Sequence, residues 1–253
     1  MRTLALVEAR LLVRHPLMLA GLALALLAAF DDVHAGMRPA FSAITATQAM
    51  FFGVPAFFAA NLATSRARRA GTEELLAPVP LSRAARTAAS CLAALGPFAV
   101  ACLAQATALA VYLATGVRLP RLPTVWELGA GPLCVLGACL LGLAVARWVA
   151  LPGVPLLVMI GLVSFSIVVN DLFDSGHLLG FNPEVVYWGP PPYRDFVGFV
   201  PGSLAWHDAY LLALGLGAAA LAMLRDSSVR ALWLGVGAAT VVAAAVSGAL
   251  AMP

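Results

Sequence analysis

Lysine is absent from this sequence, in which all fifteen basic residues are arginine. A phosphate-binding P-loop needs a lysine at the β- and γ-phosphates, so the chain cannot hydrolyse ATP through that motif. A Schiff base to retinal or to pyridoxal phosphate also needs a lysine amine. The absence of lysine therefore excludes these chemistries, and we expect the chain to carry no cofactor of its own.

Charged residues of either sign are also scarce. They make up 11% of the 253 residues, whereas hydrophobic residues make up 62%, and the mean hydropathy is +0.95. Soluble domains contain about 25% charged residues. Apolar runs recur along the sequence, and a run of about 20 residues crosses a hydrocarbon core about 30 Å thick. The composition predicts an all-α, polytopic membrane protein with one transmembrane domain over residues 1–253, because no hydrophilic stretch is long enough to fold alone.

Cysteine is rare as well, and its placement is that of a packing residue. The four cysteines are Cys91, Cys102, Cys134 and Cys139. All of them lie inside apolar runs, and none belongs to a CxxC pair. Cysteines in such surroundings usually pack as small hydrophobic side chains. We therefore expect neither a disulfide framework nor a cysteine metal site.

Motifs of intramembrane enzymes are missing too. The pair Glu73-Glu74 would suit a metal-dependent CAAX-processing protease, but position 78 is a proline where that motif needs an arginine. Neither Ser164 nor Ser166 follows the GxSG pattern of a rhomboid protease, and no HExxH motif occurs. A polar cluster at residues 170–177 offers ligand types for a divalent cation, although a solvated helix end is the simpler interpretation. We expect a protein that is not an enzyme.

The apolar runs define six to seven transmembrane helices. They cover residues 17–30, 43–63, 87–115, 128–147, 153–170, 208–224 and 231–250. The pair Gly96-Pro97 predicts a kink in the third span, because proline removes a helical hydrogen bond.

Two segments flank these spans and differ from them in composition. Residues 1–15 place three arginines among leucines and valines, and arginine is costly inside a bilayer. We expect an interfacial elbow helix there, followed by a break at Pro16, which is tolerated as a first helical residue. Residues 171–206 are rich in proline and aromatic side chains and form the longest polar segment, on the outer side.

The arginines are unevenly divided between the two sides of this topology. With the N-terminus in the cytoplasm, eleven arginines fall on cytoplasmic segments and four fall outside. Arginine-rich loops stay in the cytoplasm. The bias predicts a multi-pass protein of the cell membrane with a cytoplasmic N-terminus, and it places the most charged segment, residues 65–86, on the cytoplasmic side.

This cytoplasmic segment contains a short acidic helix that we predict to begin at Glu73. It reads SRARRAGTEELLAPVPLSRAAR and contains five arginines. Gly71 permits a turn after the second span, and Thr72 is a suitable N-cap. Glu73 and Glu74 then occupy the first turn, where the helix dipole favours carboxylates. Arginines that only fix the topology or contact anionic lipid are an alternative, but they do not explain an acidic helix between them.

The same segment limits the length of that helix. Leu75 and Leu76 give it an apolar side, and Pro78 and Pro80 end it after about a turn and a half. Ser82 is placed to cap the helix that leads into the third span. The sequence therefore predicts a short helix held near the membrane surface between two basic anchors.

The pattern of this segment resembles the first cytoplasmic loop of type-2 ABC exporter permeases. The matching residues are Arg69, Gly71, Thr72, Glu74, Leu75, Leu76, Pro80, Ser82 and Arg83. In that family the loop forms a coupling helix that binds a separate ATPase subunit. The basic N-terminal helix and the polar outer segment also fit, and residues 206–226 are similar to the family's closing span. A seventh span departs from the family's usual six.

The resemblance implies a permease subunit of an ATP-driven exporter, with ATP hydrolysis on a separate cytoplasmic ABC ATPase. The coupling helix would comprise Gly71, Thr72, Glu73, Glu74, Leu75 and Leu76. The permease would form a homo- or heterodimer in the lipid bilayer and would bind no nucleic acid. Polar residues inside the spans could line the pathway or simply bond neighbouring helices; they include Asn61, Gln105, Ser164 and Asn170.

Two other functions fit parts of the sequence. A membrane assembly factor or sensor would bind a cytoplasmic partner through the same helix without transporting anything. It differs from an exporter in whether that partner is an ATPase. An ion-coupled carrier would need titratable groups near the middle of the bilayer, and no ionisable residue lies there in the predicted spans.

Overall fold

The predicted all-α class is confirmed by a computed structural model, which describes residues 1–34, 44, 47–69, 81–117, 119, 121–149, 151–173 and 203–251. In these ranges every regular element is helical. The elements are α1 (Arg2–Val13), α2 (Pro16–His34), the π-helix η1 (Gln48–Phe52), α4 (Gly53–Arg69), α5 (Arg83–Ala93), α6 (Leu95–Thr115), α7 (Val125–Trp148), α8 (Val154–Phe173), α9 (Leu204–Asp226) and α10 (Arg230–Ala251).

Four segments of the described residues are long and apolar enough to cross a membrane. They are Arg83–Thr115 (α5 with α6), Val125–Trp148, Leu204–Asp226 and Arg230–Ala251. A fifth is added if α1 and the part of α2 up to Phe30, bent by 57° to one another, cross as one. The chain is therefore a multi-pass helical membrane protein, and the predicted third, fourth, sixth and seventh spans coincide with these four. A larger number of spans stays a prediction.

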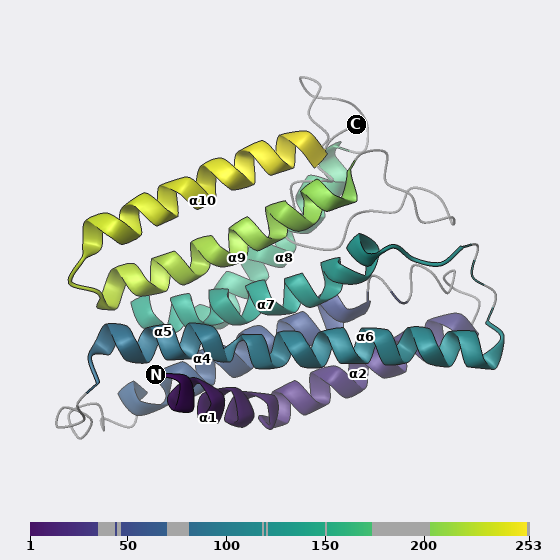
Figure 1. Ribbon diagram of the computed structural model, residues 1–253, viewed down its shortest axis with the longest axis horizontal. Coiled ribbons are helices and arrows are strands. Elements are labelled where there is room, and N and C mark those ends of the chain that lie inside the picture. The colour runs from purple at the N-terminus through teal and green to yellow at the C-terminus, as the bar shows by residue number, and fades with distance from the viewer. Residues whose placement is uncertain are drawn as a thin grey trace.

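Helix α7 lies at the centre of the bundle. It packs against α4, α6 and α9, and α9 in turn packs against α10 (Figure 1). In the most apolar window of α7, 61% of residues are buried, against 22% in α10. Val135 and Ala144 of α7 have no exposed surface. The order of the layers from the centre outward is thus α7, then α9, then α10.

Glycine permits the closest helix contact in this core. A Cβ atom on Gly142 of α7 would overlap the carbonyl oxygen of Phe57 in α4 and would lie 3.3 Å from the backbone nitrogen of Asn61. Small residues allow helix backbones to approach in this way, which favours packing in a membrane where no hydrophobic force drives helices together. Gly142 therefore fixes the distance between α4 and α7.

Proline accounts for two of the breaks between helices. The helix α1 ends at Val13 and α2 begins at Pro16, where the sequence predicts a break. Near Gly96-Pro97 the helix is interrupted at Ala94, between the end of α5 at Ala93 and the start of α6 at Leu95. The kink itself stays a prediction, because α5 and α6 together count as one candidate span. A Cβ atom on Gly96 would lie 3.1 Å from Cβ of Ala9, so the chain packs against α1 at this point.

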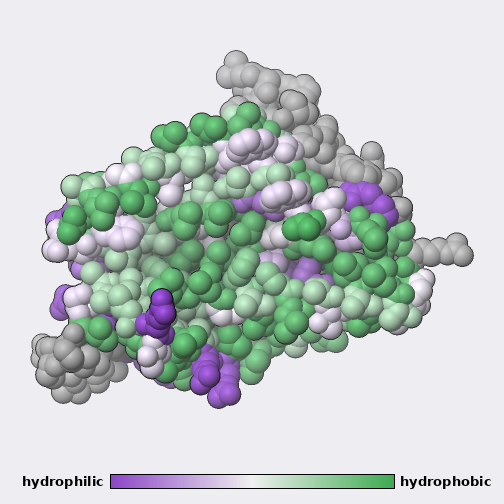
Figure 2. Space-filling view, viewed as in Figure 1, coloured by the Kyte–Doolittle hydropathy of each residue, from purple (hydrophilic) through white to green (hydrophobic). Residues whose placement is uncertain are grey.

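The surface of the bundle matches a hydrocarbon solvent. Figure 2 shows a mainly hydrophobic middle on this face, with most of the hydrophilic residues toward its ends and lower left. Large apolar side chains are exposed on the helices: Leu103 is 68% exposed and Val241 is 69% exposed. In water such a surface would aggregate, whereas in a bilayer it contacts lipid chains.

Candidate functional site

Helix ends that carry arginine gather at one end of the bundle. This arginine-rich end is formed by α1, by the last turns of α4, α7 and α9, and by the first turns of α5 and α10, and it lies at the left in Figure 1. Its described arginine side chains are Arg2, Arg10, Arg14, Arg66, Arg83, Arg86, Arg147, Arg225 and Arg230. These are arginines for which the alternating topology predicts one common side of the membrane.

A carboxylate joins three helices at this end. Asp226, the last residue of α9, is 3.4 Å from Nη1 of Arg147 in α7 through its Oδ2 atom. The hydroxyl of Thr87 in α5 donates a hydrogen bond of 2.5 Å to the same oxygen. The side chains of Arg147 and Asp226 are only 16% and 8% exposed. Because a partly buried charge is costly to leave unpaired, this Thr87–Asp226–Arg147 network holds α5, α7 and α9 in register.

The first helix is tied to the same network through α5. Ser90 of α5 donates a hydrogen bond of 2.7 Å to Oε2 of Glu8 in α1. The start of α5 is fixed by Ser82, whose hydroxyl accepts a hydrogen bond from the backbone N–H of Ala85 at 3.1 Å. The predicted capping role of Ser82 is thereby confirmed, and α5 contacts α1 as well as α7 and α9.

Trp148 closes α7 with two contacts to α9. Its indole nitrogen donates a hydrogen bond of 2.9 Å to the carbonyl oxygen of Leu221. The guanidinium of Arg225 lies 5.8 Å from the centre of its ring, within the range of a cation–π interaction. The last turns of α7 and α9 are therefore held together by charge, hydrogen bonding and aromatic contact.

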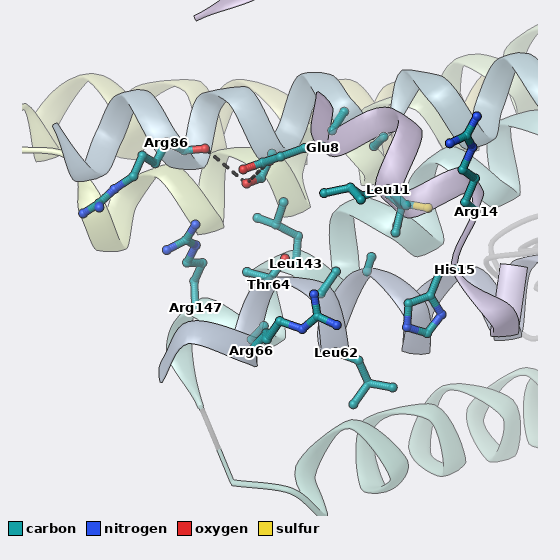
Figure 3. Close-up of a pocket in the computed structure, with 18 of the residues that line it drawn as sticks. Glu8, Leu11, Arg14, His15, Leu62, Thr64, Arg66, Arg86, Leu143 and Arg147 are labelled. Atoms are coloured by element: carbon teal, nitrogen blue, oxygen red, sulfur yellow. Dashed lines mark hydrogen bonds between the residues drawn. The ribbon is translucent and has the colours of Figure 1, made fainter. Parts of the chain in front are cut away.

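A cavity of about 850 Å³ opens at the arginine-rich end between α1, α4, α5 and α7 (Figure 3). Its charged or titratable lining residues are Glu8, Arg14, His15, Arg66, Arg86 and Arg147. Arg66 reaches from α4 toward the middle of the cavity, beneath Glu8 and Leu11 of α1 (Figure 3). Burial, and then the positive charge of Arg66, lower the pKa of His15. The cavity is electropositive because its lining contains four arginines and one glutamate.

The predicted coupling residues Gly71, Thr72, Glu73, Glu74, Leu75 and Leu76 lie outside the described residues. The helices on either side are described: α4 ends at Arg69 and α5 begins at Arg83. Both of these ends belong to the arginine-rich end. Of the two helices, α5 carries Thr87 of the Thr87–Asp226–Arg147 network, four residues after its start.

The predicted pathway residues are dispersed rather than brought together. Asn61 is 1% exposed and donates a hydrogen bond of 3.0 Å to the carbonyl oxygen of Gly142. Gln105 is 3% exposed and donates one of 2.5 Å to the carbonyl oxygen of Ile44. Ser164 is exposed on α8, and the side chain of Asn170 lies outside the described residues. Asn61 and Gln105 thus bond neighbouring segments, and a pathway role for these residues stays a prediction.

The end of the bundle opposite the arginines holds a buried carboxylate. Glu127 has no exposed surface and forms a two-pronged ion pair with Arg121. It also completes a capping box with Thr124 at the start of α7, accepting hydrogen bonds from the backbone N–H of Thr124 at 2.6 Å and from its hydroxyl at 2.9 Å. The sequence signal was the spacing Thr-x-x-Glu ahead of an apolar run, and our sequence analysis missed it.

Comparisons of the chain with protein-family models, with curated proteins and with solved structures give no match. Among the described residues, no group of three or more His, Cys, Asp or Glu side chains is arranged to hold a metal ion. The polar cluster at residues 170–177 falls largely outside those residues. The function must therefore be argued from the motif at residues 65–86 and from the geometry of the arginine-rich end.

Proposed function

We propose that the chain is the permease subunit of an ATP-driven exporter of the type-2 ABC kind. A separate cytoplasmic ATPase binds residues 71–76, and the arginine-rich end faces the cytoplasm. Support comes from the placement of this segment: it lies between α4 and α5, whose described ends both belong to the arginine-rich end. Arginine-rich segments stay in the cytoplasm, which is where an ATPase is found.

The observation that carries this proposal is the Thr87–Asp226–Arg147 network. Thr87 lies four residues after the start of α5, which is about one helical turn. A force applied to residues 71–76 would therefore reach Asp226 and Arg147 through the first turn of α5. Arg147 belongs to α7, the central helix of the bundle. A movement of the ATPase would then displace α5, α7 and α9 together, and Ser90 would carry the movement to α1 through Glu8.

In the assembled exporter α1 is the interfacial elbow helix, and six to seven spans place the polar residues 171–206 on the outer side. Two permease subunits enclose the pathway at their interface. This arrangement agrees with the interior of the single chain, where Asn61 and Gln105 donate hydrogen bonds to backbone carbonyl groups. Ser164, exposed on α8, is available to a dimer interface.

The test is a pull-down of the tagged chain from native membranes in mild detergent, with mass spectrometry of the partners. A P-loop ATPase should be recovered near one-to-one with the wild type and lost with Glu73→Arg/Glu74→Arg, because the acidic turn of the docking helix is reversed in charge. Leu122→Arg/Val125→Arg is the matched control, since these residues are 65% and 79% exposed at the opposite end.

Loss of the ATPase with the control pair as well would show a general effect of added charge and would contradict the proposal. Recovery of a cytoplasmic partner that is not an ATPase would favour an assembly factor or sensor instead.

A further inference from the structure

The cavity at the arginine-rich end has the chemistry of an anion site. Four arginines and one glutamate line it, and because Arg147 is paired with Asp226, an excess of two positive charges remains with His15 neutral. Glu8 is engaged by the hydroxyl of Ser90. Within the described part of the chain, neither Arg14 nor Arg66 has a carboxylate at ion-pair distance. Arginine presents a planar fork of donors that suits phosphate oxygens.

The opposite wall of the same cavity is apolar and runs along α7. It includes Leu143 and, deeper, Cys139, which are 3% and 1% exposed. Cys139 lies eight residues before Arg147, a distance of about 12 Å along a helix. Leu11 and Leu62 at the edge are 63% and 37% exposed. The cavity thus passes from charged side chains at the end of a span to apolar side chains at the depth of lipid chains.

We propose that this cavity binds an anionic phospholipid, with the phosphate held by Arg66 and an acyl chain lying along the apolar wall formed by α7 (Figure 3). The volume of about 850 Å³ falls within the range of small-molecule sites, roughly 300–1,000 Å³. A soluble phosphate compound would use the arginines alone and would leave the apolar wall uncovered. A lipid contacts both walls, with its phosphate on the arginines and its acyl chain on the apolar side chains. The bilayer supplies such a lipid at the level where the span ends.

Such a lipid would join α1 to the bundle. The cavity lies between α1 and α4, so a lipid bound there by Arg66 of α4 would also contact lining residues of α1 such as Leu11. Lipid binding at this site requires neither the ATPase nor transport, because the ligand comes from the membrane. It concerns only how α1 is held against the spans.

Native mass spectrometry of the purified full chain, titrated with phosphatidylglycerol, phosphatidylcholine or glycerol phosphate, tests the proposal. One phosphatidylglycerol should bind about tenfold more tightly than phosphatidylcholine. Phosphatidylglycerol carries a net negative charge at neutral pH, whereas phosphatidylcholine has no net charge. Arg14→Gln/Arg66→Gln should weaken phosphatidylglycerol binding about tenfold by removing two positive charges from the cavity lining. The matched control, Arg10→Gln/Arg83→Gln, removes two exposed arginines from the same end that do not line the cavity, and it should change binding less than about twofold.

Equal binding of the two phospholipids would overturn the proposal, as would a loss with the control pair equal to that with the cavity pair. Glycerol phosphate that binds as tightly as phosphatidylglycerol would show a soluble phosphate ligand and would overturn the assignment to a lipid. Helix content by circular dichroism and a single gel-filtration peak establish that each variant is folded. If the double variant fails these checks, Arg66→Gln alone is used and should still weaken binding.

Discussion

Three buried amide side chains hold the interior of this bundle together. Gln48 donates a hydrogen bond of 3.1 Å to the carbonyl oxygen of Ala101, and Asn61 and Gln105 make equivalent bonds to Gly142 and Ile44. The side-chain oxygens of Gln48 and Asn61 are buried, and within the described residues they have no hydrogen-bond partner. An unsatisfied polar atom in an apolar interior costs free energy, so these amides are tolerated for the contacts that their nitrogens make.

At the residue scale, Gly142→Ala is expected to lower the free energy of unfolding by about 1–3 kcal/mol, because the added methyl group overlaps the backbone of Phe57. Thermal unfolding in detergent, followed by circular dichroism, measures the change. The matched control is Gly161→Ala in α8, where a Cβ atom would meet nothing within 4 Å. A control variant as unstable as Gly142→Ala would contradict the close contact between α4 and α7.

The sequence alone leaves such residues ambiguous. An amide in an apolar run can line a pathway or bond another helix, and the sequence does not state which backbone carbonyl lies opposite. Gly142 is likewise one of 22 glycines, and only the neighbouring helix shows why this one cannot carry a side chain. Residue roles that depend on a partner distant along the chain are therefore beyond prediction from one sequence.

Elements were easier to predict than contacts, because their ends depend on local chemistry. The break before Pro16, the interruption of the helix near Pro97 and the cap at Ser82 each follow from the residue present. The network of Thr87, Asp226 and Arg147 does not, because Thr87 and Asp226 are 139 residues apart. No spacing rule relates them.

At the scale of elements, a double-mutant cycle of Thr87→Val and Asp226→Ala should give a coupling free energy of about 1.5–3 kcal/mol, the value of a hydrogen bond to a charged group. Unfolding in denaturant gives the four stabilities. Thr87→Val combined with Ser247→Ala is the control, since Ser247 bonds its own helix α10 through Ala243. Additive effects in the first cycle would mean that α5 and α9 are not joined by this hydrogen bond.

For the whole molecule, the uneven distribution of arginine was the most informative signal. Alternating spans predict that the arginine-rich segments share one side, and the described ends of α4, α5, α7, α9 and α10 meet there (Figure 1). Arginine content predicts the side of the membrane on which a segment lies. The reason is that moving a charged side chain across a bilayer is costly, however the helices pack against one another. The number of spans depends instead on the length and tilt of helices such as α8, in which the shorter stretch Val154–Phe165 is apolar, and composition does not determine these.

The central claim is that an ATPase binds residues 71–76. The most direct measurement places a photo-crosslinking amino acid at Leu75 or Leu76 in intact cells and identifies the attached protein by mass spectrometry. We predict a crosslinked P-loop ATPase from both positions and none from Leu122, which is 65% exposed at the opposite end. Crosslinked products from Leu75 and Leu76 that contain no ATPase would contradict it.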